Sequence, residues 1–222
     1  MCGRFTLRTS SKAIVEAFGL IDAPDFKPRY NISSTQAVAA IRLNPDTRNR
    51  QLAFLRWGLI PPWAGSPPIG YRMINAKAET ILGRRAFIQG FKKRRCLVIA
   101  DGYYEWKKIG NTKTPYFIRL QSDEPFAFAG IAERWERNGQ SVESCAIVTT
   151  TANELMATIH DRMPVILSPS DFDPWLDPDF KDQDRLLEML RPYPAIKMTA
   201  YTVGTMVNDP TNETKKCIKA IG

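Results

Sequence analysis

Histidine is almost missing from this chain of 222 residues, which contains only His160. The four cysteines, Cys2, Cys96, Cys145 and Cys217, are far apart and form no C-x-x-C pair. Structural and catalytic zinc sites need several Cys or His ligands, mostly at short spacings. A glycine-rich phosphate loop is also missing. The sequence therefore predicts no metal site and no cofactor.

Long apolar runs are missing as well. No stretch of about 18 apolar residues is present, and no basic segment followed by an apolar one begins the chain, so we expect neither a membrane span nor a signal peptide. These absences predict a protein of the cytoplasm or nucleus with reduced thiols. Cys96 and Cys145 lie in apolar runs, and we interpret both as core residues.

Positive charge is in excess: 31 Lys and Arg against 23 Asp and Glu give a net charge of +8. Such an excess favours a polyanionic partner such as nucleic acid, although basic runs such as Lys92-Lys93-Arg94-Arg95 and Lys215-Lys216 also fit a solvated surface.

Strand-like segments dominate the chain. β-Branched and aromatic residues between turn signals predict strands over 37–43, 52–57, 96–100, 116–120, 126–131, 144–150, 165–167 and 197–203. Apolar periodicity predicts helices over 10–18 and 184–190, with shorter ones over 77–82, 85–90 and 152–159. Without regular crossover helices, this pattern indicates an α+β fold with a mainly antiparallel, barrel-like sheet and peripheral short helices. We expect one domain over 1–222 and a monomer.

The beginning of the chain, Met1-Cys2-Gly3-Arg4, carries the most specific chemistry. Removal of Met1 would leave Cys2 with a free α-amine and a thiol on adjacent carbons. With an aldehyde this pair would form an imine and then a five-membered thiazolidine. With an amide the thiol alone would attack and give an acyl-enzyme. Position 2 is also compatible with an accident of the start site.

Three polar residues among apolar neighbours have the side chains needed to orient a carbonyl and move protons: Asn75, Glu105 and His160. Each has a structural alternative. Asn75 would cap a helix that starts after it, Glu105 would be the solvent-facing residue of an alternating strand, and His160 would be a structural histidine.

Together these stretches closely resemble the SRAP family of abasic-site processing proteins, also described as SOS-response-associated peptidases. The resemblance covers roughly the first three quarters of the chain, up to about residue 168, and fades after it. The matching segments are Met1-Cys2-Gly3-Arg4-Phe5, Arg29-Tyr30-Asn31, Trp57-Gly58-Leu59-Ile60-Pro61, Ile74-Asn75-Ala76-Lys77-Ala78-Glu79, Asp101-Gly102-Tyr103-Tyr104-Glu105-Trp106, Val148-Thr149 and His160-Asp161-Arg162-Met163-Pro164.

The resemblance implies that the protein binds abasic sites in single-stranded DNA and forms a thiazolidine crosslink through Cys2. It implies that Asn75 holds the sugar, Glu105 relays protons and His160 assists opening of the sugar ring, with weak abasic-site lyase activity as a side reaction. It also implies autoproteolytic removal of Met1, although a methionine aminopeptidase would suffice, and the cytoplasm of a bacterial or phage host. The DNA contacts that it implies are Arg4, Lys77, Arg85, Arg162, Trp57, Trp63, Trp106 and Thr149.

Two departures bear on these contacts. Lys77 stands where family members commonly have Arg, and Trp63 is followed by Ala64 where some members have a second aromatic residue. For Trp57 and Trp106, core packing is an equal alternative to base stacking. Two other functions also remain open: an N-terminal-nucleophile hydrolase resembling class-II glutamine amidotransferases, and a non-covalent single-strand DNA binder.

Overall fold

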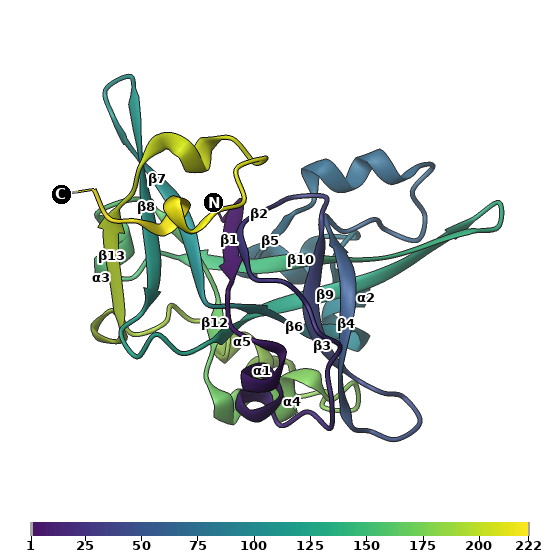
Figure 1. Ribbon diagram of the computed structural model, residues 1–222. Helices are drawn as coiled ribbons and strands as arrows, with labels where there is room; N and C mark the ends of the chain where they lie inside the picture. Colours follow the sequence, from purple (N-terminus) through teal and green to yellow (C-terminus); the bar gives the residue numbers. More distant parts are fainter. Residues whose placement is uncertain (1, 222) are drawn as a thin grey trace.

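A closed ring of five strands organises the fold of the computed structural model, which describes residues 2–221 (Figure 1). In this barrel β3 pairs with β4 and β6, β6 with β9, β9 with β10, and β10 returns to β4. The β10–β4 pairing is parallel and the others in the ring are antiparallel. The barrel strands are β3 (Ala37–Leu43), β4 (Arg50–Trp57), β6 (Arg95–Ala100), β9 (Phe126–Arg137) and β10 (Gln140–Thr151). The predicted α+β class with a barrel-like sheet is confirmed.

Three short strands extend the barrel: β5 (Asn75–Lys77), β11 (Arg162–Pro164) and β12 (Ile166–Leu167). β5 and β11 both pair with β10, and β12 pairs with β9.

A second, fully antiparallel sheet lies beside the barrel in the order β13-β8-β7-β1-β2. Its strands are β1 (Arg4–Leu7), β2 (Arg29–Ser33), β7 (Gly102–Ile109), β8 (Thr112–Leu120) and β13 (Met198–Thr202). Aromatic contacts join the two sheets. The Phe5 ring of β1 packs edge-on against Trp57, with centroids 5.1 Å apart, and against Phe128, at 5.8 Å. β1 therefore lies between β2 and β7 and also packs on the barrel.

The helices are short and peripheral, as predicted. They are α1 (Ser11–Phe18), α2 (Ile88–Lys93), α3 (Glu154–Ala157), α4 (Phe172–Leu176) and α5 (Gln183–Glu188). Six 3₁₀ segments cover Pro67–Arg72, Ala78–Gly83, Pro169–Asp171, Ala195–Lys197, Thr205–Asn208 and Lys215–Ile218. No helix among residues 2–221 is long and apolar enough to cross a bilayer.

Local signals explain where the best-predicted helix starts and stops. The Ser10 side chain accepts a hydrogen bond from the Ala13 N–H at 3.3 Å, and Gly19 ends α1 in the left-handed conformation at φ 61°. Two other helices differ from the prediction. The segment expected to be helical over 77–82 is a 3₁₀ segment, and the helix expected over 85–90 begins only at Ile88.

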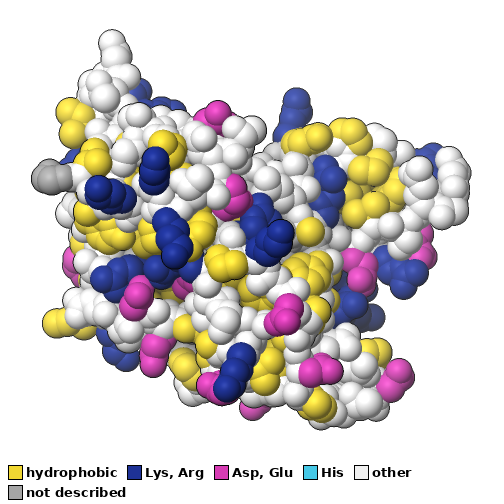
Figure 2. Space-filling view, viewed as in Figure 1, with side chains coloured by type: hydrophobic (Ala, Val, Ile, Leu, Met, Phe, Trp, Pro, Cys, Tyr) yellow, Lys and Arg dark blue, Asp and Glu magenta, His cyan; other side chains and the backbone are white. Residues whose placement is uncertain are grey.

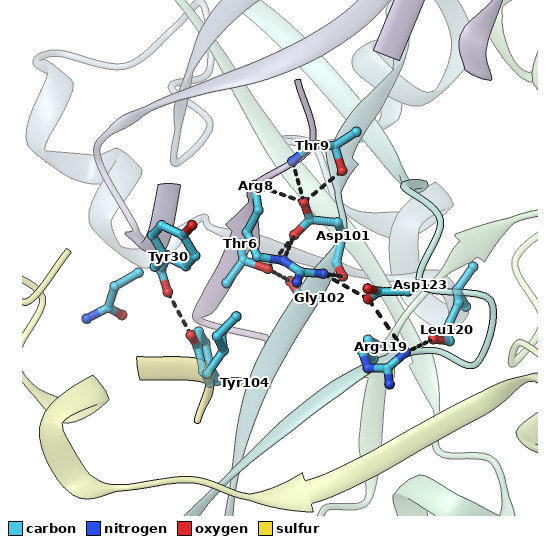
Figure 3. Close-up of polar contacts among 12 residues, drawn as sticks. Thr6, Arg8, Thr9, Tyr30, Asp101, Gly102, Tyr104, Arg119, Leu120 and Asp123 are labelled. Atoms are coloured by element: carbon cyan, nitrogen blue, oxygen red, sulfur yellow. Dashed lines mark hydrogen bonds and ion pairs between the residues drawn. The ribbon is translucent and has the colours of Figure 1, made fainter. Parts of the chain in front are cut away.

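The junction between β6 and β7 fixes the end of β1 that lies away from Cys2 (Figure 3). Asp101 is 1% exposed and accepts hydrogen bonds from Thr6 Oγ1 at 2.6 Å, from the Thr9 N–H at 2.8 Å and from Thr9 Oγ1 at 2.9 Å. The backbone N–H of Arg8 also donates to Asp101, and the Arg8 guanidinium pairs with it at 3.1 Å. A buried carboxylate needs such partners, and here they lock the register of β1.

Candidate functional site

Cys2 is fully buried two residues before the start of β1. The pairing of Arg4 with Tyr104 and of Phe5 with Tyr103 places Cys2 close to the middle of β7. Burial raises the pKa of the Cys2 thiol well above its ordinary value. The charge of Glu105 raises this pKa further, whereas a hydrogen bond with the backbone of Arg4 lowers it in part. The thiol is therefore protonated at neutral pH and needs a base to become a nucleophile.

Asn75 holds the backbone of Cys2. Its Nδ2 donates a hydrogen bond to the Cys2 carbonyl oxygen at 2.9 Å, while its Oδ1 is buried without a hydrogen-bond partner within residues 2–221. β5 carries Asn75 parallel to β10, opposite Ile147. The helix-capping alternative for Asn75 is wrong, because the following 3₁₀ segment starts at Ala78 without a side-chain cap.

Glu105 faces the interior at 4% exposure. Its Oε1 accepts a hydrogen bond from the Trp106 N–H at 3.1 Å, and its charge acts on both Cys2 and Tyr103. The solvent-facing alternative is wrong because both faces of β7 are covered. Residues of the barrel core cover the face of Tyr103, and residues 201–218 pack against the face of Tyr104 and Trp106.

His160 follows α3 on the edge of the barrel and is half-buried. Its Nδ1 accepts a hydrogen bond from the Arg162 N–H at 3.0 Å and lies 2.8 Å from Asp161 Oδ1. The two contacts require opposite states of Nδ1, because accepting needs a lone pair and pairing with a carboxylate needs a proton. His160 Nδ1 thus has both an N–H donor and a carboxylate oxygen as neighbours.

Arg162 connects the surroundings of His160 to those of Asn75. Its guanidinium donates to Glu79 at 2.6 Å, to the Thr149 carbonyl at 2.7 Å and to Thr149 Oγ1 at 3.1 Å. The hydrogen bond from Arg162 to Glu79 lowers the pKa of the Glu79 carboxyl group. Thr149 lies on β10 opposite Lys77 of β5, two positions beyond the Ile147–Asn75 pair. The end of β10 therefore lies between β5, which carries Asn75 and Lys77, and β11, which begins with Arg162.

Two of the expected cationic contacts and one expected aromatic contact are exposed, on β5 and on the segments that precede and follow it in the sequence. Trp63 is 48% exposed, and the Arg85 guanidinium carbon lies 5.1 Å from the centroid of its ring. Lys77 is also exposed. The next residue, Ala64, is buried beside Ile60 and Trp135. It therefore adds no exposed surface next to the Trp63 ring.

Two expected DNA contacts are placed differently from the expectation. Trp57 is fully buried, packs on Phe5 and donates from Nε1 to the Ile74 carbonyl at 2.9 Å, so it has no ring face to offer a base and the core-packing alternative describes it. The Arg4 guanidinium donates to Asn31 Oδ1 and to the Val207 carbonyl, both at 2.7 Å. Arg4 is thus occupied within the protein.

The chain is similar in sequence and in structure to known proteins. The family described as SOS response associated peptidase (SRAP) matches residues 1–210. The chain belongs to the SRAP family. The chain is 44% identical over 225 residues to the abasic site processing protein YoqW of Bacillus subtilis, with 99% of this chain and 100% of YoqW covered. It is 30% identical to the abasic site processing protein HMCES of Xenopus tropicalis, with 90% and 68% covered. A crystal structure of a Bacteroides thetaiotaomicron protein has a TM-score of 0.87 at 26% identity, with 99% of this chain and 100% of that chain covered.

The SRAP match extends beyond residue 168. In the structure, residues 207–213 of this later part bond to β1, β2 and β7. Asn31, fully buried, donates from Nδ2 to the carbonyls of Val207, Asp209 and Asn212 at 2.9 to 3.3 Å. Trp106 Nε1 donates to Asn208 Oδ1 at 2.8 Å. The carboxylate of a residue in this segment, Glu213, pairs with Arg29 and accepts from the backbone of Tyr30 and Asn31.

Sequence reasoning missed this role of residues 207–213, because the segment has no apolar period and its partners lie far away in the sequence. In Figure 2 the upper left of the molecule, where Figure 1 shows this segment in yellow, has several dark blue Lys and Arg side chains and a few magenta acidic ones. All four cysteines are buried and free, as expected for Cys96 and Cys145 in this SRAP chain. No cluster of potential metal ligands occurs within residues 2–221.

Proposed function

We propose that this protein processes abasic sites by forming a covalent thiazolidine with the aldehyde of an abasic residue in single-stranded DNA, through Cys2. The relatives named abasic site processing proteins support the substrate class. The observation that carries the chemistry is the position of Cys2, which is buried with its carbonyl held by Asn75 and its thiol in the field of Glu105.

The raised pKa of the thiol sets the order of steps. At neutral pH the thiol is protonated, so the free α-amine of Cys2 attacks the aldehyde carbon first. The C–N bond forms, the carbonyl oxygen takes protons and leaves as water, and an imine results. The sulfur then attacks the imine carbon, its proton passes to Glu105, and the imine nitrogen takes up a proton as the ring closes. The sum is aldehyde plus aminothiol giving thiazolidine plus water.

The other residues have the following proposed roles. Asn75 fixes the Cys2 backbone and offers Oδ1 to a sugar hydroxyl. His160 moves the proton that opens the closed sugar to the aldehyde, a task for which the alternative partners of Nδ1 suit it. Proton abstraction beside the imine would cleave the strand, so weak lyase activity accompanies the reaction.

The strand is held by exposed cations and by stacking. Lys77 and Arg85 would contact phosphates, and Trp63 would stack on a base next to the abasic site. Arg162, held by Thr149, would act from β11 at the end of β10, and Trp106 would act from β7, beside the segment that carries Cys2.

The amine requires a Cys2 without Met1, which lies outside the described residues. We propose that Met1 is removed autoproteolytically before crosslinking. A protein that retains Met1, or that has one additional residue before Cys2, has no α-amine on Cys2 and should give no thiazolidine.

Intact mass spectrometry before and after incubation with an abasic oligonucleotide tests the function. The expected spectrum shows the protein without Met1, then a denaturant-stable mass equal to protein plus oligonucleotide minus water. Cys2→Ala should abolish this adduct, whereas Cys217→Ala, which also removes a buried thiol, should retain it. A persistent adduct in Cys2→Ala refutes the proposal. Glutamine hydrolysis without an adduct would indicate the amidotransferase-like alternative, and binding that salt fully reverses would indicate the non-covalent one.

A further inference from the structure

The β7–β8 hairpin projects past the start of β1. β1 pairs with β7 only through Gly102, Tyr103 and Tyr104, whereas β7 and β8 stay paired as far as Ile109 and Thr112. In Figure 1 the hairpin rises out of the molecule above the N-terminus and the β13 side of the sheet. Cys2 and Glu105 therefore lie near its base.

Unpaired positive charge is concentrated on this hairpin. It carries Lys107, Lys108 and Lys113, and the chain has no acidic residue from position 106 to 122. Lys108 and Lys113 are exposed, and Lys107 is half-exposed. None of the three forms an ion pair within residues 2–221, where every ion pair uses an arginine or His160.

The register makes this charge unfavourable in the protein alone. Lys108 lies directly opposite Lys113, and like charges at directly opposed positions destabilise a strand pair. A polyanion bound across the hairpin would remove that repulsion. Strand alternation also places Lys107 on the same face of β7 as Glu105, roughly 7 Å further towards the tip.

We propose that the hairpin of residues 107–113 is a second DNA contact, whose lysines bind phosphates of the strand flanking the abasic residue. The inference rests on the proposed function. From Glu105 to the tip at Ile109 is four residues, or about 13 Å at ~3.3 Å per residue. That length corresponds to about four stacked nucleotides at ~3.4 Å each, and to fewer if the strand is extended. The contact therefore lies outside the nucleotide that reacts.

The length of the DNA provides the test. The crosslinking rate is measured at subsaturating concentration with an abasic trinucleotide, too short to reach the tip, and with a long single strand that has a central abasic residue. The variant Lys107→Ala/Lys108→Ala/Lys113→Ala should lower the ratio of the long-strand rate to the trinucleotide rate. The matched variant Lys12→Ala/Lys92→Ala/Lys181→Ala, which removes three exposed lysines elsewhere on the surface, should leave the ratio unchanged.

Salt dependence provides a second measurement. Each phosphate neutralised on a single strand contributes about 0.7 to the slope of log affinity against log salt, so loss of three contacts should reduce the slope by about 2. Equal slopes for the hairpin and control variants, or equal losses of rate on both DNA lengths, would overturn the proposal. If the wild type gives no adduct with either DNA, the proposed function fails, and the slope for a long strand without an abasic site still decides on the hairpin. The melting temperature of the hairpin variant should equal or exceed that of the wild type, because the substitution removes a like-charge pair.

Discussion

Asn75 donates a hydrogen bond of 2.9 Å from Nδ2 to the carbonyl oxygen of Cys2, and this contact joins an edge strand of the barrel to the beginning of the neighbouring sheet. Although 73 residues separate them, the two are held in fixed relation by the β5–β10 pairing on one side and by the β1–β7 pairing on the other.

Asn75→Asp should slow adduct formation by roughly 10- to 100-fold, because a carboxylate cannot donate to the Cys2 carbonyl and a displacement of about 1 Å has costs of that order. Single-turnover crosslinking, followed by denaturing gel electrophoresis, measures the rate. Asn49→Asp, which makes the same chemical change at an exposed turn, is the control. Equal rates for the two variants would show that the Asn75 contact has no part in the reaction.

The Asp101 cluster gives a prediction on stability. Asp101→Asn should lower the free energy of unfolding by about 2 to 3 kcal/mol, because an amide offers one acceptor oxygen to a set of five donors and breaks a buried charge-assisted network. Asp123→Asn removes another carboxylate that pairs with Arg8, at 3.0 Å, but its side chain is 55% exposed and its loss should cost at most about 1 kcal/mol. Urea denaturation of both variants measures the difference, and a loss as large for Asp123→Asn would contradict this ranking.

Stability should fall in alkaline solution. Burial raises the pKa of the Cys96 thiol from 9.0 to about 12, and it also raises the pKa values of Cys2, Cys145 and Tyr103. A group whose pKa is higher in the folded than in the unfolded state keeps its proton on folding, so its contribution is complete below the unfolded value and declines above it. Each buried thiol should therefore lower the free energy of unfolding by about 1.4 kcal/mol per pH unit above pH 9.

Denaturation at pH 8, 9.5 and 10.5 measures this decline. Cys96→Ala should make it shallower by one thiol's share, whatever its effect at neutral pH. A free energy of unfolding that stays constant from pH 8 to 10.5 would show that these thiols keep ordinary pKa values in the fold.

Trp63→Ala should weaken binding of single-stranded DNA by about 1 to 3 kcal/mol, the range for loss of one stacked base. The melting temperature should hardly change, because the ring is 48% exposed. Phe54→Ala removes another exposed aromatic ring, 49% exposed on β4, and serves as the control in fluorescence anisotropy. If Phe54→Ala weakens binding as much as Trp63→Ala, stacking at Trp63 is not specific.

The sequence predicted the barrel strands well because their cores are rich in β-branched and aromatic residues between clear turn signals. β6 is buried along its whole length, because one of its faces lies in the barrel interior and α4 packs on the other. Its sequence is accordingly a continuous apolar run over 96–100. β1 and β2 were not predicted. Their short, mixed sequences contain Arg4, Arg29 and Asn31, whose polar groups bond to one another, to Gln36 and chiefly to residues 207–213.

The same long-range packing explains the errors at the site. An alternating pattern around Glu105 predicts a solvent face only if one side of the strand is uncovered, and the sequence does not indicate that residues 201–218 return to cover it. The residue type of Asn75 is equally compatible with a helix cap. The local sequence does not indicate the actual structure, because β5 pairs with β10, a strand more than 70 residues away. The proximity of Cys2, Asn75 and Glu105 follows from the topology, so only the family resemblance anticipated it.

The central position of β1 imposes a constraint on the length of the chain. With neighbours on both sides and Asp101 fixing its far end, β1 cannot slide to compensate for an insertion or deletion. One residue more or less between Cys2 and Arg4 would shift the thiol by about 3.3 Å and turn it to the opposite face of the sheet. The spacing between Cys2 and β1 is thus fixed by the sheet, and an affinity tag for purification belongs after the last residue of the chain.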